Sequence, residues 1–125
     1  MTGRNSPTRP PLRDCIAAWD AIVAQVEAGY RLDLDEWLND MDLRRGIGEA
    51  IEALKPARRL RNVALFERLA AIDERFRRAT VETVKCLWGS AVAVREGWRA
   101  DRHWWYFRRP RNGNQQLDLN IENVS

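Results

Sequence analysis

The sequence has few of the residues that build metal sites and nucleophilic active sites. Its 125 residues include one histidine, His103, and two cysteines, Cys15 and Cys86. Zinc sites that need several imidazoles cannot form from this chain alone. No C-x-x-C pair is present, so we expect both thiols to be reduced and buried. A cysteine paired with His103 is the one scheme of nucleophilic catalysis available, and the apolar neighbours of both cysteines favour a structural role.

Motifs that bind nucleotides or calcium are also missing. The chain contains no Walker A loop, no G-x-G-x-x-G and no G-x-S-x-G. An EF-hand loop beginning at Asp33 would need glycine and glutamate where Leu38 and Arg44 stand. Asp40 and Asp42 could hold magnesium, but helix capping and a solvated acidic face explain them more simply. We therefore predict no cofactor, no resident metal and no enzymatic activity.

No stretch of the sequence resembles a membrane span or a secretory signal. The longest uncharged run, residues 86–94, is far shorter than the roughly 20 apolar residues of a spanning helix. The first eleven residues, MTGRNSPTRPP, contain no apolar core. We expect a cytoplasmic protein with no membrane partner.

Helical periodicity extends over the chain as far as Ala79. The first predicted helix ends at a Gly29 cap and carries an apolar stripe of Leu12, Ile16, Trp19, Val23, Val26 and Tyr30. A second helix is predicted from an Asp33 cap to Leu54, with a break near Asp40. The third runs from about Pro56 to Ala79, with a stripe of Leu65, Leu69, Ile72 and Phe76.

The C-terminal part of the chain has a different character. It holds the aromatic cluster Trp88, Trp98, Trp104, Trp105, Tyr106 and Phe107. The β-branched residues within 81–88 indicate a strand or a weak helix, and HWWYFR at 103–108 indicates a strand. Asn112-Gly113 is typical of a hairpin turn and would pair Trp104 with Ile121. The alternative is that the Asn- and Gln-rich end is disordered.

These patterns predict a mainly α fold. We expect a small bundle of about three to five helices with an aromatic C-terminal segment, which can include a short β-hairpin. A flexible tail is predicted over residues 1–11, a single helical domain over 12–110, and a polar tail or hairpin strand over 111–125.

The charge is divided along the chain. Residues 12–54 hold ten acidic and four basic residues, whereas residues 55–85 hold four acidic and nine basic ones. Arg61, Arg68 and Arg75 are seven apart, so they form a stripe along the third helix with no carboxylate three or four positions away. Either this stripe pairs with the acidic half across the bundle, or it faces a polyanion.

We favour a protein that acts by docking onto another protein, in the manner of bacterial immunity or antitoxin-type inhibitors. The grounds are the exclusion of the classes above, the small size, and the division of the chain into an acidic and a basic part. The contact candidates are the acidic patch and the aromatic segment: Asp33, Asp35, Glu36, Asp40, Asp42, Trp104, Trp105 and Arg108. The alternative is nucleic-acid binding through Arg61, Arg68, Arg75, Arg108 and Arg109. The oligomeric state is left open.

Overall fold

Helix α1 spans Leu12–Ala28 and carries the apolar stripe that the sequence predicts. The structure, a computed structural model, describes residues 10–125. The buried residues of α1 are Ile16, Trp19, Val23 and Val26. Gly29 ends the helix at φ 112°, a conformation that glycine adopts without the strain a Cβ would bring. The predicted tail over residues 1–11 falls almost entirely outside the described residues.

Helix α2 is continuous over Leu34–Glu52, so the predicted break near Asp40 is wrong. The Asp33 side chain caps the helix by accepting a hydrogen bond from a first-turn backbone N–H at 2.9 Å. Met41 and Ile47 continue the buried face beyond Asp40. This packing outweighs the cost of about 1 kcal/mol that each of the two glycines in the helix brings.

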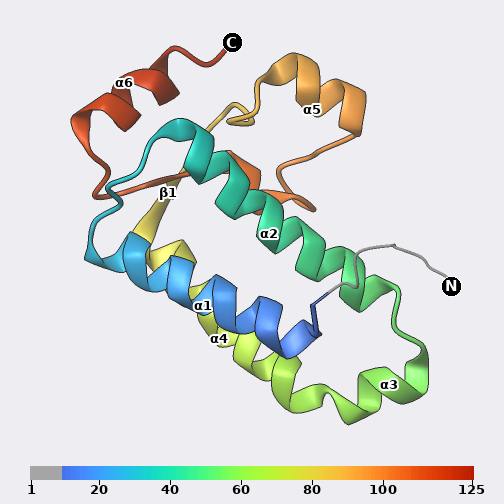
Figure 1. Cartoon of the computed structure of the whole chain (residues 1–125). Helices are drawn as coiled ribbons and strands as arrows, with labels where there is room; N and C mark the ends of the chain where they lie inside the picture. The colour runs from blue at the N-terminus through green and yellow to red at the C-terminus, as the bar shows by residue number, and fades with distance from the viewer. Residues whose placement is uncertain (1–9) are drawn as a thin grey trace, which may run out of the picture.

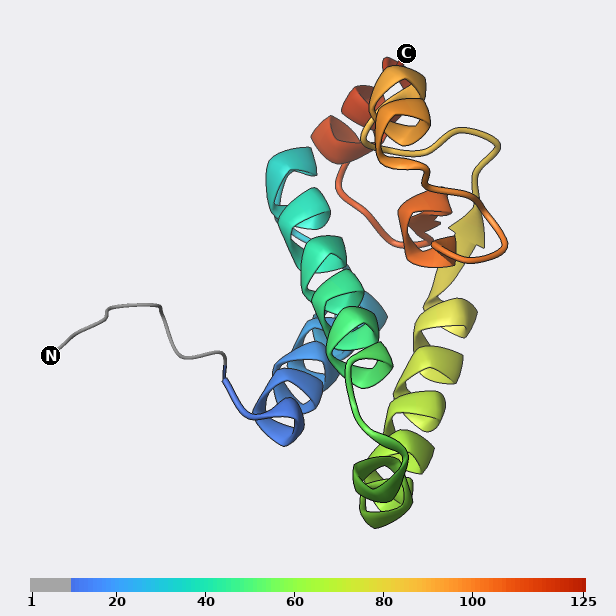
Figure 2. The same ribbon diagram turned by 90° about the vertical axis from the view of Figure 1, so that its right-hand side faces the viewer.

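The predicted third helix is interrupted at Asn62. A short helix, α3, spans Pro56–Arg61, and α4 follows over Val63–Ala79 with the predicted stripe buried at Leu69, Ile72 and Phe76. Helix α1 packs against both α2 and α4 (Figure 1). Figure 2 shows α3 at the end of the molecule opposite the C-terminal helices.

A two-stranded antiparallel ribbon connects α4 to the end of the chain. Strand β1, Thr80–Glu82, pairs with β2, Arg108–Pro110, and Val81 lies opposite Arg109. Between them lie helix α5, Ser90–Glu96, and a 3-10 turn, η1, at Trp104–Phe107. The strand predicted over residues 103–108 is therefore wrong for most of its length, because the aromatic residues turn inward to bury Trp105 and Tyr106.

Residues 111–125 are neither the polar tail nor the hairpin strand that the sequence predicts. Helix α6 spans Gln115–Glu122, and the Asn114 side chain caps it by accepting from the Leu117 backbone N–H at 2.9 Å. Leu117 and Ile121 are four residues apart, lie on one side of α6 and are buried in the core. No pairing of Trp104 with Ile121 is formed.

The mainly α fold that the sequence predicts is confirmed. Six α-helices, one 3-10 turn and one short ribbon make up the described residues. The largest fully buried side chains are Trp19, Trp37, Tyr30, Tyr106 and Phe76, so aromatic rings dominate the interior. Within residues 10–125, no helix is long and apolar enough to cross a membrane.

Candidate functional site

The acidic residues around α2 do not gather on one surface. Asp40 accepts a hydrogen bond from the Tyr30 hydroxyl at 2.6 Å, and Asp42 accepts one from the Tyr106 hydroxyl. Burial is the main cause that raises the pKa values of both tyrosines, and the neighbouring carboxylates add to the rise. Asp33 is the α2 cap. These three carboxylates therefore each accept a hydrogen bond from the protein itself, and Asp33 stays exposed together with Asp35 and Glu36.

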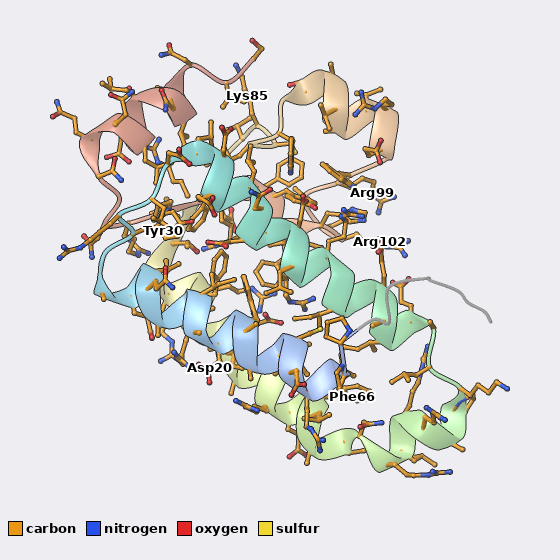
Figure 3. The ribbon with its side chains drawn as sticks, viewed as in Figure 1. Asp20, Tyr30, Phe66, Lys85, Arg99 and Arg102 are labelled. Carbon is orange, nitrogen blue, oxygen red and sulfur yellow. The ribbon has the colours of Figure 1, made fainter. Side chains whose placement is uncertain are left out.

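The arginine stripe is paired with α1 over two of its three members. Arg75 donates to Asp20 at 2.7 Å and to Glu27 at 2.7 Å, and Arg68 lies 3.5 Å from Asp20. The hydrogen bonds from Arg75 hold the pKa values of Asp20 and Glu27 below their ordinary range. In Figure 3 the side chain of Asp20 lies where α1 meets α4. Arg61 forms no ion pair with any residue in 10–125.

The arginines of β2 are bonded within the fold as well. Arg108 donates to the Thr80 hydroxyl at 2.7 Å and to the Arg77 carbonyl at 3.2 Å, so it helps to close the C-terminal end of α4. Arg109 donates to Asp118 at 3.0 Å. Neither guanidinium can bind phosphate unless these hydrogen bonds are broken.

The aromatic segment is part of the core. Trp105 is buried, and the guanidinium of Arg44 lies 4.9 Å from its ring and 5.6 Å from that of Trp104. The guanidinium of Arg77 lies over the Trp104 ring, 4.0 Å from its centre. An Arg/Trp face that closes the interior therefore explains these rings better than an exposed recognition surface does.

Sequence reasoning missed the ionic centre behind that face. Arg44 forms two hydrogen bonds with Asp73, which also accepts from the Trp19 indole N–H at 3.0 Å. Asp73 and Arg77 are four residues apart, the spacing of an ion pair along one helix, but Asp73 pairs with Arg44 of α2 instead. One signal was available: Asp73 stands four residues after Leu69, which places it on the apolar stripe of α4.

The groups that could act in catalysis are not assembled. Burial raises the pKa of the Cys86 thiol, which keeps it protonated at neutral pH. His103 uses its Nδ1 to accept from the Arg99 backbone N–H at 3.2 Å. Within residues 10–125, no three His, Cys, Asp or Glu side chains come together as a metal site.

An apolar groove remains open between the first turns of α2 and helix α5. Its volume is about 390 Å³. In Figure 2, α5 and α6 gather beside the N-terminal end of α2. The apolar side chains that line the groove are Leu34, Leu38, Leu87, Trp88, Ala91, Val92 and Val124. The exposed Asp35 follows Leu34 in the first turn of α2.

Comparison with known proteins assigns no relative to this chain. No family model matches it, and no curated protein and no solved structure is significantly similar to it.

Proposed function

We propose that this protein acts by stoichiometric docking onto another protein, with the groove between α2 and α5 as its contact. The observation that carries the proposal is the apolar lining of that groove. Leu34 and Leu38 lie on one side and Val92 on the other, around about 390 Å³ of open space. An open groove lined by apolar side chains is a common form of binding site, because water is released when a partner fills it.

Helix α5 supports the same reading. Four of its seven residues are Ala or Val, yet none is buried, and two of them, Ala91 and Val92, line the groove. An isolated helix of this length is not stable in water. An apolar helix held at the surface by the residues that flank it is suited to receive a partner.

The matching partner segment carries apolar side chains for the groove and a basic residue at its edge. Asp35 is exposed beside Leu34, so a lysine or arginine of the partner can meet it. This makes Asp35 the member of the predicted acidic patch that best fits a contact role.

The small size of the protein, and a proposed docking role that involves no catalysis, agree with a cytoplasmic inhibitor of the immunity or antitoxin type. Nucleic-acid binding is the weaker alternative, because four of its five predicted arginines are bonded within the chain: Arg68, Arg75, Arg108 and Arg109.

The products of the neighbouring genes are the first partners to test, because an inhibitor commonly travels with its target. Each is mixed with the wild-type chain and analysed by size-exclusion chromatography with light scattering. We expect one product to form a complex of fixed stoichiometry. Val92→Asp should weaken that complex by about tenfold or more, because it places a charge in the apolar contact.

Val94→Asp is the matched control, since it makes the same change on the same helix at a residue that does not line the groove. It should leave the affinity unchanged. A complex that forms equally well with Val92→Asp would show that the groove is not the contact. A chain that binds none of these products would count against the inhibitor class.

A further inference from the structure

The chain has a second unpartnered surface at the end of the molecule opposite the groove. Residues 53–66 contain four basic residues and no carboxylate. Every residue of α3 is exposed, and Figures 1 and 2 show this helix away from α5 and α6. The surface, here called the basic corner, consists of Lys55, Arg58, Leu60, Arg61 and Val63.

The cations of the basic corner differ from most others in the protein because they have no carboxylate partner. Lys55, Arg58 and Arg61 form no ion pair with any residue in 10–125. Their neighbour Arg59 has a structural task, since it donates to the carbonyls of Leu54 and Glu52 at 3.1 Å and 3.0 Å and closes the end of α2. Three cations are therefore left without a carboxylate partner within residues 55–61.

Two of these cations share one side of α3. Arg58 and Arg61 are three residues apart in the helix, which puts them roughly 4.5 Å apart along its axis. Lys55 precedes α3 as its N-cap. Leu60 comes directly before Arg61 and lies on a neighbouring side of the helix, and Val63 begins α4 after the break between the two helices. Leu60 and Val63 are 77% and 46% exposed. The basic corner thus combines charge and exposed apolar side chains around one short helix.

We propose that the basic corner docks onto an acidic surface of another protein that receives α3, with carboxylates for its unpaired cations and a shallow apolar pocket for Leu60. Charge complementarity selects the acidic partner. Phosphate contacts alone would make no use of the exposed Leu60. A helix of six residues with one leucine buries too little apolar area to hold a membrane surface. The proposal does not depend on the groove.

Binding to defined probes tests the proposal. The probes are a fluorescent helical peptide with glutamates and leucines on one face, a DNA duplex, and vesicles that contain phosphatidylserine. We expect the peptide to bind. The double variant Arg58→Glu, Arg61→Glu should weaken its binding by about tenfold or more. Leu60→Ser should weaken it by about fivefold, from the loss of apolar burial.

Arg95→Glu and Val94→Asp on α5 are the matched controls, because they change an exposed arginine and an exposed valine away from the corner. They should leave peptide binding unchanged, and all variants should keep the wild-type melting temperature. Failure of the peptide to bind overturns the proposal. It is equally overturned if DNA or vesicles bind more tightly than the peptide and Leu60→Ser has no effect.

The results of the peptide-binding experiment are independent of the results of the experiment on the groove. The peptide probe reports on α3 alone, whereas the complex with a neighbouring gene product reports on α5. Either surface can therefore fail its test while the other passes.

Discussion

Arg44 and Asp73 form a bidentate ion pair in the interior, with Arg44 Nε 3.0 Å from Asp73 Oδ1 and Nη2 2.9 Å from Oδ2. Both side chains are about nine-tenths buried. The pair joins α2 to α4, and the Trp19 indole N–H joins α1 to the same carboxylate. One buried carboxylate thus links three helices, because Arg44 of α2 and Trp19 of α1 both donate to Asp73 of α4.

Breaking this pair on one side should strongly destabilise the protein. Arg44→Met leaves Asp73 as an unpaired buried charge, and we expect a loss of about 3–5 kcal/mol of unfolding free energy, measured by urea denaturation. Adding Asp73→Asn should recover much of that loss. It removes the charge and keeps an oxygen to accept from the Trp19 indole N–H.

The pair between Arg99 and Asp101 is the matched control. It has the same two-bond geometry, at 3.1 Å and 2.8 Å, but lies on the surface. Arg99→Met should therefore give no measurable change. Equal losses for Arg44→Met and Arg99→Met would contradict the assignment of the internal pair as a structural centre.

Arg75 should contribute stability that depends on pH. It bridges Asp20 and Glu27, and we expect Arg75→Met to cost about 1 kcal/mol at neutral pH, because partial exposure screens the bridge. The folded protein lowers the pKa values of both carboxyls. Their contribution is therefore present above their ordinary values near 4 and is lost as the pH falls through the lowered values.

Arg61→Met is the control within the same stripe, because Arg61 has no ion pair in residues 10–125. Its unfolding free energy should match that of the wild type at neutral and at acid pH. A loss for Arg75→Met that persists undiminished at pH 3 would mean that packing, and not the carboxylates, accounts for it.

Helix α6 should prove to be part of the core and not a tail. Leu117→Ala should cost about 2–4 kcal/mol, because Leu117 is fully buried and its removal leaves a cavity. Leu119→Ala changes the same residue type two positions away, where the side chain is 47% exposed. We expect little change for this second variant in thermal or urea unfolding. Equal effects of the two substitutions would contradict the helix.

The long helices were predictable because each carries several apolar residues at helical spacing. The stripe from Ile16 to Val26 and the Asp33 cap give α1 and the start of α2 directly. The C-terminal part was not predictable in the same way. LDLNI satisfies both the alternation of a strand and the four-residue spacing of Leu117 with Ile121, so short-range pattern could not choose between strand and helix.

The candidate site was harder to predict, because pairing across the fold decides which charges stay free. Neither Arg75 nor Arg61 has a carboxylate three or four positions away in the sequence, yet only Arg75 pairs with carboxylates, on α1. Leu34 and Val92 are far apart in the chain, so nothing local places them across one groove. Which charges pair, and which apolar side chains line one groove, follows only from the three-dimensional structure.

His103 should make the protein less stable as the pH falls below neutrality. Burial lowers the pKa of its imidazole, and the positive charges of Arg102 and Arg99 lower it further, against an opposing effect from Glu52. The ordinary value is 6.5. Below that pH the imidazole is protonated in the unfolded chain but still neutral in the folded protein. The free energy of unfolding therefore falls with pH until the pH reaches the lower pKa of His103 in the folded protein.

Two measurements check this prediction. Titration of the imidazole by NMR should give a pKa below 6.5 in the folded protein. Urea denaturation of the wild type and of His103→Gln, at constant ionic strength between pH 7 and pH 5, should show a shallower loss of stability for the variant. Because both proteins share every carboxylate, their difference isolates the imidazole. A difference that does not change over this pH range would show that the environment of His103 does not favour its neutral form.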